Sequence, residues 1–325
     1  MERGAKLRAR ENRPGQRLRL LDRARRHRDP DGRSAVRSGL AEGVGVSRMT
    51  ADPKRTAGQQ DIDAVMAILD ATGKQALGMF DRIDKRRIRE KSPGDFVSDA
   101  DRALEVALCE RLRLAFPGDG LCGEELGGRP AGTYWTIDPI DGTSNFLSGL
   151  PLWCISVARM KDDVPHLGGI HAPALGLSAA GGPGIGFEVR GTTVLADGPP
   201  RPCFGVGRNA NWNGAERASL ESRIESRGFN IVSLGSCAVS LLFVALGRLS
   251  GYLEIGCDGI WDSAGGIALC RANGIRADFR IAGDSTVDVE AGLSAECRDP
   301  PNSPGSSNRS STGAFLFPFS ACFGK

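Results

Sequence analysis

Apolar and polar residues follow two different periods along this chain, which predicts a mixture of helices and strands. Apolar side chains three or four residues apart predict helices over residues 62–80 and 101–116. Short runs rich in β-branched and aromatic residues predict strands over 134–137, 152–158 and 168–172. Helical spacing then returns over residues 214–227, 237–248 and 260–271. Two helices are therefore expected before the first of these strands.

The length and composition fit an ordinary globular protein. At 325 residues, with 40% hydrophobic and 25% charged content, the chain can form one large domain or two packed lobes. No apolar run approaches the ~20 residues that a membrane-spanning helix needs. The Arg-rich start also lacks the apolar core of a secretory signal. We therefore expect a cytoplasmic protein that does not contact the membrane.

The two ends of the chain differ from its middle. Residues 1–60 carry 16 Lys or Arg against 7 Asp or Glu and are expected to be a disordered basic extension. Met49 is a candidate native start, which would place residues 1–48 outside the native protein. Residues 293–325 combine a Pro- and Ser-rich stretch with an apolar end, which suggests a frameshift or truncation. Sequencing the locus would refute that hypothesis by returning the same tail.

The nine cysteines form no C-x-x-C pair and no zinc-like spacing, so they are expected to be reduced thiols. Cys154 is the most plausible nucleophile by type. It lies within an apolar run that predicts a strand, which favours a buried, unreactive thiol. None of the three histidines lies in a phosphatase nucleophile motif.

Candidate chemistry is concentrated in residues 136–146, directly behind a short apolar strand. Asp138 and Asp141 are separated by a turn that contains Pro139, so both carboxylates can converge on a hard cation. Gly142 and Thr143 follow and can offer backbone N–H groups to an anion. This combination predicts a metal-dependent phosphate site, with an ordinary Asp-rich turn as the alternative.

Three further segments support the metal site. They are the stretch from Lys91 to Asp101 with Glu105 after it, the triplet Gly123-Glu124-Glu125, and the run around Trp261 and Asp262. In this order and at these separations, the four motifs resemble the inositol monophosphatase family. The resemblance covers about residues 61–279, and it leads us to expect a catalytic domain over 61–292.

The resemblance implies an α/β fold, a layered α-β-α-β-α sandwich of the inositol monophosphatase and fructose-bisphosphatase type. It also implies a Mg²⁺-dependent, lithium-sensitive phosphomonoesterase that forms a homodimer. One Mg²⁺ would be held by Glu124, Asp138 and the carbonyl oxygen of Ile140. A second would be held by Asp138, Asp141 and Asp262. Two such cations suit in-line phosphoryl transfer to water.

The resemblance assigns further roles around these ligands. Thr143 and Asp101 would orient the attacking water and relay its proton, with Glu124 in the same catalytic group. Glu254 would accept hydrogen bonds from a substrate hydroxyl. Lys91 has a possible supporting role, or it is a surface lysine. Further substrate contacts are expected from the backbone around Ala238 and from Asp141, Gly142, Thr143 and Asp262.

Two of these residues also have simpler interpretations. Asp262 can be a helix cap, and Glu124 can be a solvated surface acid. The sequence also departs from the family pattern at residues 271–274 and in the Gly-rich segment 160–200, which puts stability and dimerisation in doubt more than the chemistry.

Several functions remain open. The substrate is expected to be inositol monophosphate or a similar small phosphate ester. Alternatives within the same superfamily are histidinol phosphate, fructose 1,6-bisphosphate and phosphoadenosine phosphate. Alternatives of another class are a non-catalytic relative that binds metal or phosphate and a nucleic-acid-associated protein that uses the basic extension. Nucleic acid is disfavoured because no aromatic residues interleave the basic ones.

Overall fold

The computed structural model describes residues 56–82, 89–92, 95–97, 99–125, 127–128, 131–191, 202–282 and 286–292. For residues 89–92 and 95–97 it describes the backbone but not the side chains. All of these residues belong to one compact unit, Ala51–Lys325.

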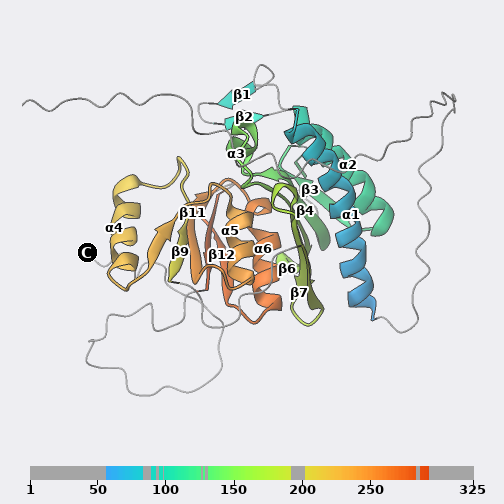
Figure 1. The fold of residues 1–325 in the computed structure, drawn as a ribbon. Coiled ribbons are helices and arrows are strands. Elements are labelled where there is room, and N and C mark those ends of the chain that lie inside the picture. Colours follow the sequence, from blue (N-terminus) through green and yellow to red (C-terminus); the bar gives the residue numbers. More distant parts are fainter. Residues whose placement is uncertain are drawn as a thin grey trace, which may run out of the picture. The chain divides into compact units, whose positions relative to one another are not determined.

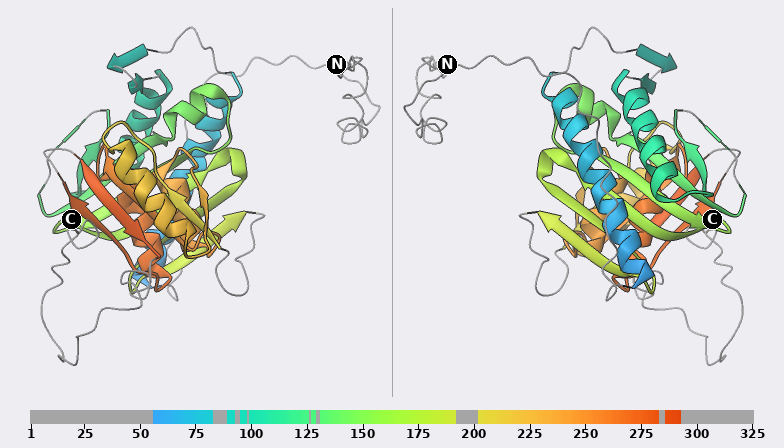
Figure 2. Two further views of the ribbon diagram at one scale, coloured as in Figure 1. Left: turned by 90° about the vertical axis from the view of Figure 1, so that its left-hand side faces the viewer. Right: turned by 90° about the vertical axis from the view of Figure 1, so that its right-hand side faces the viewer.

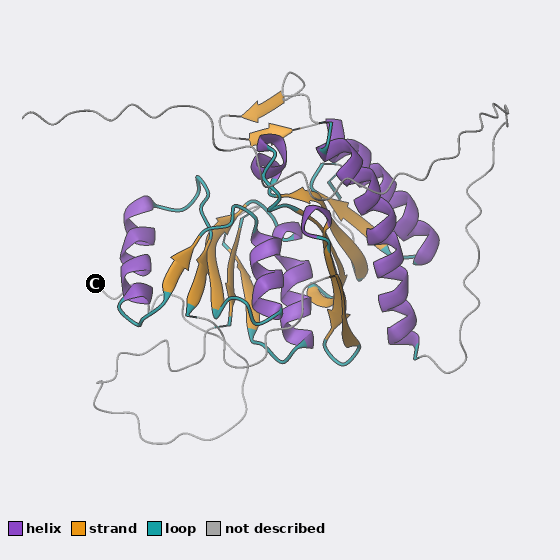
Figure 3. Ribbon diagram, in the orientation of Figure 1, coloured by secondary structure: helices purple, strands orange, loops and turns teal. Residues whose placement is uncertain are grey.

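The described residues form five layers in which helices alternate with sheets (Figure 1). A helix pair covers one face of a six-stranded sheet, and a second pair fills the space between that sheet and a five-stranded one. A further helix packs on the outer face of the five-stranded sheet. Colouring by secondary structure makes the alternation visible (Figure 3). The predicted layered α/β sandwich is confirmed.

The six-stranded sheet has the order β3-β4-β5-β6-β7-β8. Strands β3 and β4 are parallel, and every other neighbouring pair is antiparallel. Its strands are β3 (Gly120–Gly123), β4 (Thr133–Asp141), β5 (Cys154–Lys161), β6 (Val164–Ala172), β7 (Leu177–Gly182) and β8 (Gly186–Gly191).

The five-stranded sheet has the order β10-β9-β11-β13-β12. Strand β9 is parallel to both of its neighbours, and β13 is antiparallel to both of its own. Its strands are β9 (Cys203–Val206), β10 (Asn230–Val232), β11 (Gly251–Cys257), β12 (Ala277–Ile281) and β13 (Val287–Ala291). A separate two-stranded sheet pairs β1 (Arg89–Ser92) with β2 (Asp95–Val97).

Outer helices α1 (Ala57–Phe80) and α2 (Asp99–Ala115) lie side by side against the six-stranded sheet (Figure 2). The Thr56 hydroxyl accepts a hydrogen bond from the Gln59 N–H at 3.2 Å and caps the start of α1. An apolar stripe along each helix faces the sheet and is buried.

Inner helices α5 (Cys237–Ala245) and α6 (Trp261–Ala272) are buried on nearly every side. Small residues let α6 approach the six-stranded sheet closely. A Cβ atom on Gly168 of β6 would lie 2.2 Å from the Gly265 carbonyl oxygen of α6. The remaining helices are α3 (Thr143–Ser148) and α4 (Gly214–Glu225).

All the predicted helices and strands are present, with ends shifted by a few residues. One boundary needs correction. The basic extension was expected to reach residue 60, but α1 begins at Ala57 because Thr56 caps it. Residues 1–55 and the predicted tail 293–325 lie outside the described residues. The pattern did not predict β1 to β3 or β7 to β13. Among these, β7 and β9 include buried glycines in place of a clear alternation.

No helix in the described part of the chain is both long enough and apolar enough to cross a membrane.

Candidate active site

A β-bulge in β4 brings Asp138 and Asp141 to one side of the sheet. In a regular strand, two residues three apart point to opposite faces. Here Asp138 pairs with Ser156 and Asp141 with Cys154, so β4 uses three steps where β5 uses two. The extra residue restores a common face. Pro139 lies within the bulge, where a missing N–H donor is tolerated.

Asp138 is the most enclosed of the predicted carboxylate ligands, with 2% of its surface exposed. Its Oδ1 accepts a hydrogen bond from the Ile140 N–H at 3.0 Å, which fixes the turn. Burial raises the pKa of Asp138 well above its usual range, and repulsion from Glu124, Asp141 and other nearby acids adds to this. A cation would relieve this repulsion.

Asp141 connects β4 to the start of α5. Its Oδ2 accepts hydrogen bonds from the Ser236 hydroxyl and, at 2.6 Å, from the Ala238 N–H. Its Oδ1 accepts from the Cys237 N–H at 3.3 Å. Burial raises the pKa of Asp141 to about 6, although the Ser236 and Ala238 hydrogen bonds act in the opposite direction. The carboxylate is therefore oriented by groups almost 100 residues away in sequence.

Asp262 lies in the first turn of α6, as predicted. The residue at the N-cap position is Ile260, and it makes no side-chain capping hydrogen bond. Burial raises the pKa of Asp262 well above its usual range, and repulsion from Asp141 and Glu124 follows as the next cause. Asp262 therefore faces the other acids and is not the N-cap of α6.

Glu124 follows directly after β3 and lies beside β4. Its N–H donates to the Ile137 carbonyl oxygen at 3.1 Å, which continues the β3–β4 pairing by one residue. Glu124 is partly buried, and its charge contributes to the raised pKa of both Asp138 and Asp262. It is therefore a member of the acidic cluster and not an isolated surface acid.

Two acids on the buried face of α2 lie next to this group. Asp101 is 2% exposed and is among the charges that raise the pKa of Asp138. Glu105 is fully buried, and its Oε2 accepts the Glu125 N–H at 2.7 Å. Glu105 thus supports the loop that carries Glu124. Glu105 belongs to the upstream motif of the sequence analysis, which assigned it no specific role.

The start of α3 lies immediately behind the bulge. The Thr143 hydroxyl donates to the Ile140 carbonyl oxygen at 2.9 Å, which is the carbonyl predicted to bind metal. Gly142 has a φ of 89° and a Cβ atom there would lie 3.0 Å from the Leu152 carbonyl oxygen, so only glycine fits well. The predicted contacts of these two residues with substrate stay predictions.

A cavity of about 110 Å³ opens beside Asp141 and Asp262, and its lining includes Tyr252, Glu254 and Arg208. Glu254 is held in place from two sides. The Tyr252 hydroxyl donates to its Oε2, and the Asn209 side-chain amide donates to its Oε1 at 2.9 Å.

The sequence analysis missed Tyr252, Asn209 and Arg208. Tyr252 stands two residues before Glu254 and so shares its face of β11, which was a usable signal. Nothing in the local sequence singles out the other two, which follow β9.

The predicted roles of Lys91 and Ala238 stay predictions. Lys91 lies in β1, but its side chain is outside the described residues. The Ala238 N–H donates to Asp141, so a contact between Ala238 and substrate stays a prediction.

The donor set suits hard divalent cations. Glu124, Asp138, Asp141 and Asp262 offer only carboxylate oxygens, and the Ile140 carbonyl lies between two of them in the bulge. Mg²⁺ and similar ions prefer oxygen ligands of this kind. Burial raises the pKa of Asp138, Asp141 and Asp262, and repulsion from neighbouring carboxylates adds to this; such ions would compensate that negative charge.

The chain is similar to known proteins of one family. The model of the inositol monophosphatase family matches residues 59–292. Protein y4fL of Sinorhizobium fredii is 40% identical over 71% of this chain and 83% of its own length. Inositol-1-monophosphatase of Mesorhizobium japonicum is 33% identical over 60% of this chain and 76% of its own. Among solved structures, the Thermotoga maritima IMPase has a TM-score of 0.61 at 25% identity, covering 71% of this chain and 91% of its own.

Proposed function

Because the chain belongs to the inositol monophosphatase family, we propose that it is a Mg²⁺-dependent phosphatase for inositol monophosphate or a similar small phosphate ester. Its class is that of a phosphoric monoester hydrolase, as in its named relatives. The observation that carries the proposal is the mutual repulsion among Glu124, Asp138, Asp141 and Asp262. Two of these acids, Asp141 and Asp262, line the cavity.

Four carboxylates and one carbonyl would hold two Mg²⁺ ions. Glu124, Asp138 and the Ile140 carbonyl would bind one, and Asp138, Asp141 and Asp262 the other. When bound, the ions supply Lewis-acid polarisation of the phosphoryl group and of a water molecule. The ester would enter through the cavity, because Asp141 and Asp262 form part of its wall.

The protein's own groups would direct the attacking water. The Thr143 hydroxyl donates a hydrogen bond to the Ile140 carbonyl oxygen. The lone pairs of the hydroxyl oxygen can therefore accept a hydrogen bond from water. Asp101 lies in the same buried acidic environment as Asp138, where a carboxylate can take up the water proton. This pairing of an orienting hydroxyl with a proton acceptor is the proposed positioning device for hydrolysis.

The substrate's alcohol part would face Glu254. Tyr252 and Asn209 each donate one hydrogen bond to this carboxylate, so its remaining lone pairs can accept a substrate hydroxyl. Relatives of the chain include a histidinol-phosphatase of Mycobacterium tuberculosis and a fructose-1,6-bisphosphatase/inositol-1-monophosphatase of Thermotoga maritima. The cavity lining around Glu254 is where preferences among such substrates would arise.

The test is phosphate release by the purified full chain from inositol 1-phosphate, histidinol phosphate, fructose 1,6-bisphosphate and phosphoadenosine phosphate, with and without Mg²⁺. We expect Mg²⁺-dependent turnover that Li⁺ inhibits. Asp138→Asn should reduce kcat by about 10²–10³-fold, because it removes the shared ligand. Asp278→Asn, an exposed acid on β12, is the matched control and should leave turnover unchanged. Turnover without metal, or full activity in Asp138→Asn, would refute the proposal.

A further inference from the structure

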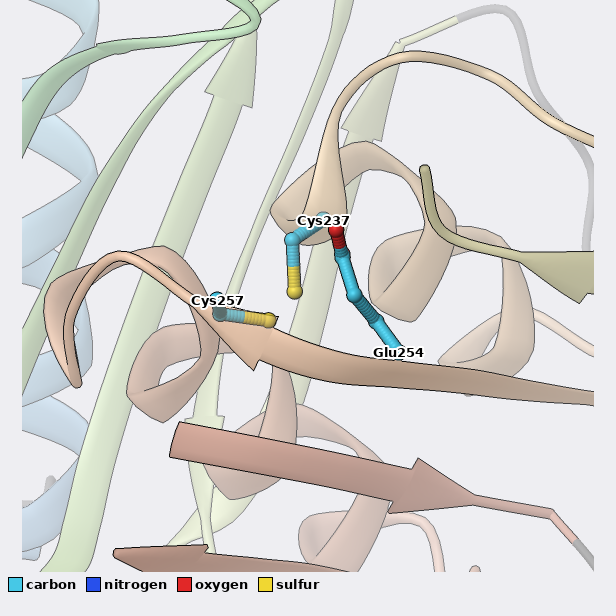
Figure 4. Close-up of side chains that lie close together, drawn as sticks. All are labelled: Cys237, Glu254 and Cys257. Atoms are coloured by element: carbon cyan, nitrogen blue, oxygen red, sulfur yellow. The ribbon is translucent and has the colours of Figure 1, made fainter. Parts of the chain in front are cut away.

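A second group of potential metal ligands lies next to the oxygen-only site, and two of its members line the same cavity as Asp141 and Asp262. It consists of Cys237, the first residue of α5, together with Glu254 and Cys257 of β11 (Figure 4). One ligand atom from each residue lies within 4.8 Å of the other two, and all three residues are buried.

A second β-bulge explains why Glu254 and Cys257 point the same way. Glu254 pairs with Val289 and Cys257 with Val287, so β11 uses three steps where β13 uses two. Gly256 lies inside the bulge with a φ of 75°, a conformation that favours glycine. Its N–H donates to the buried Asp288 Oδ1 at 3.0 Å, which holds the distorted backbone in place.

The donor set differs chemically from the site on β4. Two cysteine sulfurs and one carboxylate favour a thiophilic divalent cation over Mg²⁺, which prefers oxygen alone. Three protein ligands with a fourth position open to solvent are a common zinc arrangement. Cys237 and Glu254 line the cavity, which leaves room for a water as the fourth ligand. The hydrogen bonds from Tyr252 and Asn209 orient Glu254, as outer groups orient metal ligands elsewhere.

We propose that Cys237, Glu254 and Cys257 form a Zn²⁺ site that inhibits the enzyme. Both thiols release their protons to solvent on binding, and the two thiolates and the carboxylate compensate the cation's charge. The cation binds the Glu254 carboxylate and so competes with the substrate hydroxyl that would hydrogen-bond to the same carboxylate. The inhibitory role rests on the proposed function, whereas the binding site does not.

Co²⁺ bound to thiolate gives a charge-transfer absorption band in the near ultraviolet, and it serves as the probe. The full chain is titrated with Co²⁺ under a reductant that does not bind metal, with Mg²⁺ saturating. We expect one thiolate-bound Co²⁺ per chain, displaced by Zn²⁺. Cys257→Ala and Cys257→Ser should each weaken this binding at least about tenfold. Cys109→Ala is the matched control, since Cys109 is an equally buried free thiol on α2. Thermal melts verify that each variant is folded.

Phosphate release is then measured across the same Zn²⁺ range. We expect inhibition to follow occupancy of the thiolate site in the wild type and in Cys109→Ala, and to need at least about tenfold more Zn²⁺ in Cys257→Ser. Absence of the thiolate band, or a band that persists in both Cys257 variants, would overturn the site. Equal inhibition of the wild type and Cys257→Ser would overturn the inhibitory role, because the cation would then act at the carboxylates. If the thiolate–Co²⁺ band appears but the protein releases no phosphate, the cation site is upheld, and both the inhibitory role and the proposed function are refuted.

Discussion

Ser236 connects the acidic site to the start of a buried helix. Its hydroxyl oxygen caps α5 by accepting the Val239 N–H at 3.1 Å, and the same hydroxyl donates to Asp141. One side chain therefore contributes to both stability and ligand geometry. Short polar side chains at helix N-termini commonly have the first role, while the second depends on β4 being in reach.

We expect Ser236→Ala to reduce the free energy of unfolding by about 1 kcal/mol, or a Tm decrease of roughly 2–4 °C. It also removes a hydrogen bond that lowers the pKa of Asp141, so the acidic limb of the pH–activity profile should move to higher pH. Asn213→Ala is the control. The Asn213 Oδ1 caps α4 by accepting hydrogen bonds from the Ala215 and Glu216 N–H groups, so its loss should reduce the free energy of unfolding by a similar amount. That control should leave the acidic limb in place, and an unchanged limb in Ser236→Ala would contradict the assigned role.

The pKa of Asp141 also predicts how the metal-free protein responds to pH. Its folded value of about 6 lies above the ordinary 3.8, so the folded state retains a proton that the unfolded state loses between these values. The contribution of Asp141 to stability is therefore greatest below about pH 4 and is lost as the pH rises to about 6.

Denaturant unfolding of chelator-treated wild type and Asp141→Asn, at about pH 4.5 inside that window and at about pH 7 above it, tests this directly. The stability difference, wild type minus variant, should become smaller or more negative at the higher pH. A difference that grows with pH would mean that the folded-state pKa is not raised.

At the scale of elements, the close approach of α6 to β6 positions Asp262. The contact is between Gly168 and the backbone of Gly265, where a Cβ atom would come within 2.2 Å of the carbonyl oxygen. Backbone atoms cannot move aside as a flexible side chain can. The whole helix would have to shift, and Asp262 in its first turn would shift with it.

Gly168→Ala should therefore destabilise the protein by at least about 1–3 kcal/mol and lower kcat together with apparent metal affinity. Gly78→Ala, within α1, is the matched control, because its new methyl group meets nothing closer than 3.7 Å. A gain of about 0.5–1 kcal/mol is expected there. The pair is compared by thermal melts and Mg²⁺ titration of activity. Full activity and stability in Gly168→Ala would show that the layers can separate without effect.

At the scale of the whole molecule, the acidic site draws its ligands from separate layers. Glu124 and Asp138 belong to the six-stranded sheet, while Asp262 belongs to the inner helix pair. The two proposed cations, which share Asp138, would together connect these layers and stabilise only the folded chain. Binding at 100 times Kd would add about 2.7 kcal/mol to the free energy of unfolding.

Addition of Mg²⁺ to chelator-treated protein should therefore raise the Tm in a concentration-dependent way. The increase should be much smaller in Asp138→Asn and should be unchanged in Asp278→Asn. Differential scanning calorimetry over a Mg²⁺ series measures it. A Tm that does not respond to Mg²⁺ in the wild type would be evidence against the carboxylate site.

The sequence alone determined the helices with strong apolar stripes, the central strands and the family's motifs. These signals are local, because helical spacing and a turn such as that between Asp138 and Asp141 are complete within a few residues. The short strands β7 and β9 escaped prediction, because fully covered sheets remove the alternation that marks a strand.

Only the tertiary structure decided which side chains meet. Two β-bulges turn Asp138 with Asp141, and Glu254 with Cys257, to common faces, and a bulge depends on the register of the partner strand. The contact between Ser236 and Asp141 joins residues 95 positions apart. Such contacts follow from packing of the layers, which no local pattern encodes, and they convert a set of recognisable acids into a defined site.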